Sequence, residues 1–118
     1  MAKTRILILE DDPVIARGYE KVLRDAGNEV TVCTSFEDAR KQLRADPPDA
    51  VLTDVRVGQY NGLQLAHLFR EYSATGRVVV VTGYDDIVLR HDVESLPGEF
   101  LVKPINIARL RSVFGAAA

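Results

Sequence analysis

The sequence has a single cysteine and no long apolar run. Cys33 has no partner for a disulfide within the chain, which excludes the framework of a small disulfide-stapled secreted domain. Because Cys33 lies in an apolar run, we expect it to be a small buried hydrophobic residue. No apolar stretch approaches the length of a membrane span. The apolar segment after the basic N-terminus also stops too early for a secretory signal. We therefore expect a soluble, cytoplasmic protein.

The sequence also has little excess charge of either sign. The formal net charge is −2 and the pI is near 5.6, so nothing attracts the chain generally to nucleic acid or to anionic membranes. Its 118 residues, 47% of them apolar, suffice for one core. We expect residues 1–118 to form a single domain that has no direct nucleic-acid or membrane partner.

Two kinds of apolar pattern alternate along the chain. Runs typical of buried strands lie at residues 5–9, 29–33, 50–53, 78–81 and 100–102, and a segment with helical spacing follows each of them. Residues 85–95 are charged and only partly amphipathic, which predicts an abbreviated fourth helix. Five alternations predict an α/β fold: a doubly wound, five-stranded parallel sheet in a flavodoxin-like (βα)5 three-layer sandwich. Right-handed crossovers favour the strand order 2-1-3-4-5.

Local signals predict where the helices begin and end. Asp12, Ser35 and Asn106 are expected N-caps, each just before a helical pattern. Gly27 is expected to end the first helix and Gly76 the third. The apolar face of the third helix is expected to carry Leu65, Leu68, Phe69 and Tyr72, and that of the last helix Ile107, Leu110 and Phe114.

Polar residues stand at four strand ends that should share one edge of the sheet. In the expected strand order, the carboxyl ends of strands one, three, four and five lie along the same rim, where ligands bind in such sheets. The residues at these ends are Glu10, Asp11 and Asp12, then Asp54, then Thr82 and Gly83, then Lys103 and Pro104. Any one acid is most simply a helix cap, a turn residue or part of a solvated surface. Agreement of four strand ends favours a site.

The charges at this rim predict a bound cation. At roughly 5 Å and an effective dielectric near 20, each pair of like charges costs on the order of 3 kcal/mol. Without a counter-ion some of the acids would have to take up protons, and Lys103 offsets only one charge. Oxygen ligands without a nearby His or Cys favour Mg²⁺, with Mn²⁺ as an alternative.

Such a site suits transfer of a phosphoryl group to a carboxylate. Asp54 could attack phosphorus and form an aspartyl phosphate. The cation, Lys103 and the hydroxyl of Thr82 could stabilise the developing charge. A carboxylate nucleophile needs no general base, and His67 and His91 both fall on expected helices away from the rim.

Taken together, the four strand ends resemble the CheY-like receiver domain of bacterial two-component response regulators, over essentially the whole chain. The match consists of the acidic pair after strand one, the Asp that closes strand three, Thr-Gly after strand four and Lys-Pro after strand five, all in order and spacing. One position departs from the family pattern: Gly58 stands where a proline is usual, four residues after Asp54.

The resemblance implies a role for each site residue. Asp54 would be the phosphoacceptor, Asp11 a direct Mg²⁺ ligand, and Glu10 a ligand through a water molecule. The backbone carbonyl of Arg56 would complete the protein ligands. Thr82 and Lys103 would bind the phosphoryl group. Phe100 would be a switch aromatic that turns inward when Thr82 moves. Arg56 and Tyr84 would slow the access of water and so tune dephosphorylation.

The first functional hypothesis is a signalling switch, with a sensor histidine kinase or a histidine phosphotransfer protein as donor and an unidentified protein as target. We expect a phosphoacceptor with slow autodephosphorylation rather than an enzyme that acts on other substrates. The start at Met1, close to the first strand, favours a stand-alone receiver over a module of a larger regulator or hybrid kinase.

Three alternatives compete with the switch. A small-molecule Mg²⁺-dependent phosphatase or phosphotransferase would need a lid, and the loops are too short for one. A flavodoxin-like cofactor binder would need a phosphate loop where this chain has three acids. A degenerate receiver that serves only as a scaffold would not need Asp54, Thr82 and Lys103.

Overall fold

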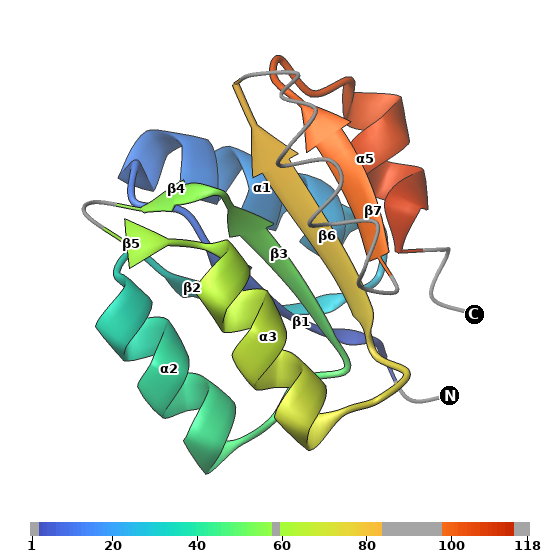
Figure 1. Cartoon of the computed structure of the whole chain (residues 1–118). Coiled ribbons are helices and arrows are strands. Elements are labelled where there is room, and N and C mark those ends of the chain that lie inside the picture. Colours follow the sequence, from blue (N-terminus) through green and yellow to red (C-terminus); the bar gives the residue numbers. More distant parts are fainter. Residues whose placement is uncertain (1–2, 58–59, 84–97, 115–118) are drawn as a thin grey trace.

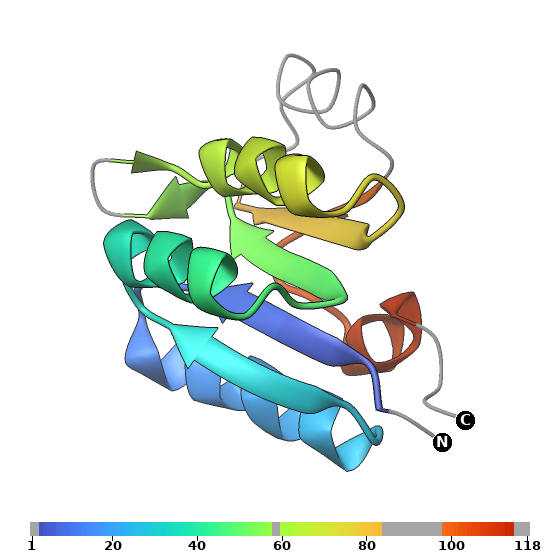
Figure 2. The same cartoon turned by 90° about the horizontal axis from the view of Figure 1, so that it is seen from below.

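In the computed structural model, a five-stranded parallel sheet lies between two layers of helices (Figures 1 and 2). The structure describes residues 3–57, 60–83 and 98–114. The strands of the sheet are β1 (Arg5–Leu9), β2 (Glu29–Cys33), β3 (Ala50–Asp54), β6 (Arg77–Thr82) and β7 (Gly98–Val102). Their order is β2-β1-β3-β6-β7. Counted among these five strands alone, this is the expected order 2-1-3-4-5.

The helices cover the two faces of the sheet in pairs. Helices α1 (Pro13–Asp25) and α5 (Ile107–Val113) lie on one face, and α2 (Phe36–Ala45) and α3 (Leu63–Tyr72) lie on the other (Figure 2). Strand side chains alternate between two apolar clusters, so Leu7 and Val51 point to the α2/α3 side while Ile8 and Leu52 point to the α1/α5 side. The continuous apolar runs are therefore buried on both faces, as expected.

The expected caps are present at three helix starts. The side chain of Asp12 accepts hydrogen bonds from the amides of Val14 and Ile15. Oγ of Ser35 accepts from the amide of Asp38 at 3.2 Å. Oδ1 of Asn106 accepts from the amide of Arg109 at 3.0 Å. Each contact satisfies a backbone donor that the helix itself leaves unpaired. Gly27 follows the end of α1 with φ of 96°, and Cys33 is buried.

Two details of the helices differ from the expectation. Helix α3 ends at Tyr72, and Gly76 lies four residues beyond that end, where a Cβ atom would come within 2.4 Å of the Phe69 ring. Gly76 therefore serves close packing and does not cap the helix. Tyr72 and Ile107 are 46% and 62% exposed, because each stands at the end of its helix and leaves burial to inner residues such as Phe69 and Leu110.

A short hairpin follows β3 that the sequence patterns did not predict. Strands β4 (Arg56–Val57) and β5 (Tyr60–Asn61) pair antiparallel between β3 and α3, beside the carboxyl end of the sheet (Figure 1). Several expectations fall outside the described residues, namely those on Gly58, Tyr84, His91 and residues 85–95. None of the helices in the described part of the chain combines the length and apolar character that a membrane span requires.

Candidate functional site

The register of the sheet brings the polar strand ends together. Leu9 lies opposite Thr53 in the β1–β3 pair, so the next residues, Glu10 and Asp54, lie side by side. Thr82 lies opposite Val102 in the β6–β7 pair, and the amide of Lys103 donates to the carbonyl of Thr82 at 2.7 Å. The arrows of β1, β3, β6 and β7 point to this one edge (Figure 1).

Strand alternation decides which face each of these side chains takes. Glu10, Asp54 and Lys103 each come two residues after a core residue on the α1/α5 side, namely Ile8, Leu52 and Leu101. Because side chains along a strand repeat every two residues, all three point to that side. Thr82 instead follows Val80, which belongs to the cluster under α2 and α3. Two acids and a lysine thus meet on one face, and a threonine closes the rim from the other.

Lys103 lies between the two buried carboxylates. Its Nζ is 2.7 Å from Oδ2 of Asp54 and 3.8 Å from Oε2 of Glu10. Asp54 is 8% exposed and Glu10 is 2% exposed. The other Asp54 oxygen, Oδ1, accepts the backbone N–H of Arg56 at 3.3 Å. The Asp54 carboxylate is therefore held by one donor on each oxygen.

The site carries more negative charge than Lys103 neutralises. Burial raises the pKa of Glu10 to about 8, together with a hydrogen bond that protonated Glu10 donates to Asp54 and with charge repulsion by Asp54. Burial lowers the pKa of Lys103, but the hydrogen bond to Asp54 and the nearby carboxylates outweigh it and raise the pKa overall. With this pKa, Glu10 favours the protonated form at neutral pH.

A cavity of about 330 Å³ opens at this rim. It is lined by Glu10, Asp11, Asp12, Ile15, Asp54, Arg56, Thr82, Gly83 and Lys103. All four expected acids, the lysine and the threonine therefore border one space. Gly83 is exposed, and a Cβ atom there would meet nothing within 4 Å. His67 is exposed on α3 and does not line the cavity, whereas His91 lies outside the described residues.

The donor set at the rim fits a hard cation that keeps much of its water. Oε2 of Glu10 is buried and has no hydrogen-bond partner in the structure. Within residues 3–57, 60–83 and 98–114, no group of three or more His, Cys, Asp or Glu side chains is arranged as a metal cage. Two carboxylates, a backbone carbonyl and water molecules are a typical coordination for Mg²⁺, which rarely occupies an all-protein cage.

Thr82 and Phe100 lie on the same face of neighbouring strands. Phe100 is opposite Val80, and Val80 is two residues before Thr82, so all three share the α2/α3 side. Phe100 is half-buried and packs against the cluster under α2 and α3, whereas Thr82 is 2% exposed. A movement of Thr82 toward the cavity would therefore change the space beside Phe100.

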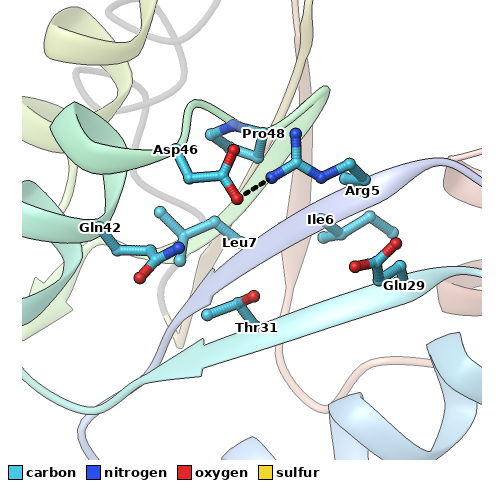
Figure 3. A pocket seen from close by; sticks show the side chains of 8 residues that line it. All are labelled: Arg5, Ile6, Leu7, Glu29, Thr31, Gln42, Asp46 and Pro48. Atoms are coloured by element: carbon cyan, nitrogen blue, oxygen red, sulfur yellow. Dashed lines mark ion pairs between the residues drawn. The ribbon is translucent and has the colours of Figure 1, made fainter.

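A second depression lies at the opposite edge of the sheet and is too small for a ligand. Figure 3 shows that it is closed by Arg5 and Asp46, whose side chains are 2.5 Å apart. Its volume is about 10 Å³, roughly the room for one water molecule. Arg5 also donates to the carbonyl of Pro47 at 3.1 Å, so the depression joins β1 to the connection between α2 and β3. The contacts of Arg5 at this depression therefore have a structural role.

The identity of the chain follows from comparison with known families. The model of the response regulator receiver domain matches residues 6–114. The chain belongs to the response regulator receiver domain family. The strand-end residues of the site all lie inside the matched region of this receiver domain.

Individual relatives agree with the family assignment. The receiver domain is 32% identical to the alginate biosynthesis transcriptional regulatory protein AlgB of Pseudomonas putida over 91% of its own length and 24% of that protein's. It is 30% identical to the transcriptional regulatory protein AfsQ1 of Streptomyces coelicolor, over 92% and 50% of the two lengths. The chain thus spans a quarter to half of these curated relatives.

A solved structure shows the same fold. It is a response regulator protein from Burkholderia pseudomallei with a phosphorylated aspartic acid, a calcium ion and citrate. The TM-score is 0.85 at 22% identity, with 95% of this chain and 66% of that one covered.

Proposed function

We propose that this receiver domain is a phosphorylation-dependent switch in which Asp54 accepts the phosphoryl group. The observation that carries the proposal is the orientation of the Asp54 carboxylate, which is held by Lys103 and by the Arg56 N–H at the edge of a 330 Å³ cavity. The phosphorylated aspartic acid and calcium ion in the Burkholderia pseudomallei regulator support the same chemistry for this chain.

The cation of the proposed site is Mg²⁺, or Mn²⁺ in its place. Asp11, Asp54 and the carbonyl of Arg56 would hold it directly, and Glu10 would assist through a water molecule. When bound, it supplies positive charge to the phosphoryl oxygens during transfer. The buried Oε2 of Glu10 supports this assignment: it has no hydrogen-bond partner, and Nζ of Lys103, at 3.8 Å, is too distant to donate to it, so a water molecule on the cation could do so.

Phosphoryl transfer needs only positioning and charge from the remaining residues. An oxygen of Asp54 forms the new bond to phosphorus while the bond from phosphorus to the donor's imidazole nitrogen breaks. Lys103, now 2.7 Å from Asp54, would bind a phosphoryl oxygen instead, since its long side chain can follow the charge. The hydroxyl of Thr82, at the far side of the cavity, would donate to a second oxygen.

The readout in this proposal passes through Phe100. If Thr82 moves toward the phosphoryl group, it vacates space on the α2/α3 side, and Phe100 on the neighbouring strand turns inward. The switch is reset by autodephosphorylation, a separate reaction in which water attacks phosphorus, the bond to Asp54 breaks and inorganic phosphate leaves. We propose that Arg56, which is exposed and lines the cavity, and Tyr84, which follows Gly83 in the sequence, slow this step by limiting the access of water.

The partners are proposed from the same chemistry. A sensor histidine kinase or histidine phosphotransfer protein would be the phosphodonor, and a protein would bind the switched surface in the cytoplasm. The relatives AlgB and AfsQ1 are transcriptional regulatory proteins that extend well beyond the matched domain. In a longer regulator, an output domain rather than the receiver would contact nucleic acid.

Intact mass spectrometry tests the proposal. The domain is incubated with Mg²⁺ and a small phosphodonor, and we expect one phosphoryl group per chain. Asp54→Asn should abolish this adduct, while Asp25→Asn, an exposed acid on α1, should leave it unchanged. Turnover of the donor without dependence on Asp54 would instead indicate a phosphatase, and no reaction with any donor would indicate a scaffold.

A further inference from the structure

The hairpin of β4 and β5 has a register that determines the direction of the Arg56 peptide groups. Arg56 lies opposite Asn61, and Val57 lies opposite Tyr60. The amide of Gly62 donates to the carbonyl of Val55 at 2.6 Å. Bonded and non-bonded pairs alternate along an antiparallel ladder. With a bond between residues 55 and 62, the next pair, Arg56 and Asn61, is a non-bonded one.

The backbone of Arg56 therefore faces away from β5. In a non-bonded pair, the N–H and the C=O of a residue both point away from the partner strand. The N–H of Arg56 donates to Oδ1 of Asp54 at 3.3 Å, which identifies this side as the side of the phosphoacceptor. The carbonyl of Arg56 points to the same side, where the proposed cation lies. One residue of the hairpin thus presents both backbone groups to the site.

Two valines fasten this part of the hairpin to the core. Val55 and Val57 are 3% and 2% exposed, and both belong to the cluster under α2 and α3 together with Phe69. Arg56, between them, is exposed and lines the cavity. This alternation is that of a strand with one buried face. Val55 is also fixed by the hydrogen bond from its amide to the carbonyl of Val81 at 2.9 Å, whereas Val57 pairs with Tyr60 of the hairpin and reaches the core through its side chain.

We propose that Val57 is a positioning residue for phosphoryl transfer. By anchoring β4 in the core, it holds the Arg56 N–H against Asp54 and keeps the Arg56 carbonyl directed at the cation position. The consequence for transfer rests on the proposed function, but the mechanical role of Val57 does not. Loss of the anchor lets the Arg56 backbone move relative to Asp54, and small displacements of reacting groups cost about 10- to 100-fold in rate.

The experiment compares two matched truncations, Val57→Ala and Val78→Ala. Val78 is fully buried in the same cluster, but it stands at the opposite end of the sheet, where it pairs with Val51. The first readout is amide hydrogen exchange of Arg56 and of the β3 strand in metal-free protein. The second readout is the rate of phosphorylation by a small phosphodonor at saturating Mg²⁺. Val57→Ile provides a conservative rescue.

In Val57→Ala we expect exchange of the Arg56 amide to accelerate at least about tenfold while the β3 amides stay protected, and the phosphorylation rate to fall at least about tenfold. Val78→Ala should change neither quantity beyond its effect on global stability. Val57→Ile keeps a branched apolar side chain, so its exchange and phosphorylation rates should stay close to those of the unsubstituted domain. Val57→Thr and Val78→Thr, which keep the volume and weaken the apolar contact, replace the alanine pair if Val57→Ala does not fold.

Equal acceleration of exchange at Arg56 in both truncations would overturn the proposal, because Val57 would then be an ordinary core residue. An unchanged Arg56 amide in Val57→Ala would overturn it as well. Failure of the proposed function gives a different result: no variant, including the unsubstituted domain, would carry phosphate on Asp54, although the exchange of Arg56 would still respond to Val57.

Discussion

Gly62 lies against the backbone of Asp54. A Cβ atom on Gly62 would be 1.7 Å from the Asp54 carbonyl oxygen and 2.5 Å from Oγ1 of Thr53, closer than any real contact. The backbone of Gly62 has ordinary helical angles, so it is the close approach, and not the conformation, that requires glycine. The amide of Gly62 also donates a hydrogen bond to the carbonyl of Val55 at 2.6 Å, which keeps the start of α3 close to the end of β3.

We therefore expect Gly62→Ala to displace Asp54. Overpacking of this kind costs about 1–3 kcal/mol in the free energy of unfolding. Displacement of the carboxylate should slow phosphorylation about 10- to 100-fold. Urea unfolding and the rate of adduct formation by mass spectrometry measure the two effects.

The matched control for this substitution is Gly18→Ala. Gly18 lies within α1, and a Cβ atom there would meet nothing within 4 Å. Alanine should stabilise the helix by up to about 1 kcal/mol and leave phosphorylation unchanged. A Gly62→Ala protein that is phosphorylated as fast as the Gly18→Ala protein would show that Asp54 tolerates the added methyl group.

Glu10 should make the metal-free domain less stable as the pH rises. Its pKa is raised from 4.5 to about 8 in the folded protein, so the folded state holds a proton that the unfolded state has released. The contribution is complete below about pH 4.5 and is lost as the pH rises to about 8. The free energy of unfolding should fall by up to about 1.4 kcal/mol per pH unit within this window.

Urea unfolding between pH 5.5 and 7.5, in the presence of a chelator, measures this slope. Glu10→Gln cannot titrate and should lose it. His67 and His91 are present in both proteins, so the difference between the two slopes belongs to Glu10 and to groups coupled to it. Identical slopes would mean that Glu10 has an ordinary pKa and that the rim holds no excess negative charge.

The sequence patterns predicted those features that depend on strand order and on chain-local signals. Alternation of apolar segments was sufficient for the five-stranded sheet, and parallel strands necessarily bring Glu10, Asp54, Thr82 and Lys103 to one rim. Caps at Asp12, Ser35 and Asn106 were predicted because each satisfies backbone donors within three residues.

Features set by contacts distant in the sequence were missed or assigned wrongly. Gly76 fits the Phe69 ring, and Gly62 fits the Asp54 backbone; a pattern of glycines does not show which atoms approach them. The β4–β5 hairpin has only two residues in each strand, too few for a period-two pattern. The placement of Lys103 between Asp54 and Glu10 depends on side-chain conformation, which the order of strand ends does not determine.

Thr82 should couple the phosphoryl group to Phe100. Phosphorylation, or binding of beryllofluoride as its mimic, should shift the ring resonances of Phe100 in NMR spectra. Thr82→Val removes the hydroxyl and keeps the volume, so most of this shift should disappear although the site still binds the mimic. Thr31→Val, on an exposed position of β2, is the control. A full shift of the Phe100 resonances in Thr82→Val would show that the Thr82 hydroxyl does not couple the phosphoryl group to Phe100.

Arg56 and Tyr84 should lengthen the life of the phosphorylated form. Arg56 lines the cavity and Tyr84 follows Gly83 in the sequence, and both side chains are large, so we expect their removal to open a path for water. We expect the double variant Arg56→Ala/Tyr84→Ala to lose phosphate severalfold faster, measured as the decay of the adduct mass after removal of the donor. A longer half-life in the double variant would show that these side chains assist hydrolysis instead of hindering it.

Borohydride trapping tests the central claim most directly, because it identifies the phosphorylated residue. Hydride reduces an acyl phosphate to an alcohol with release of phosphate, which converts a phosphorylated aspartate to homoserine. After treatment with Mg²⁺ and a small phosphodonor, peptide mass spectrometry should find homoserine at position 54. Homoserine at Asp11 or Asp12 and none at position 54, or a stable phosphate on another side chain, would contradict the account.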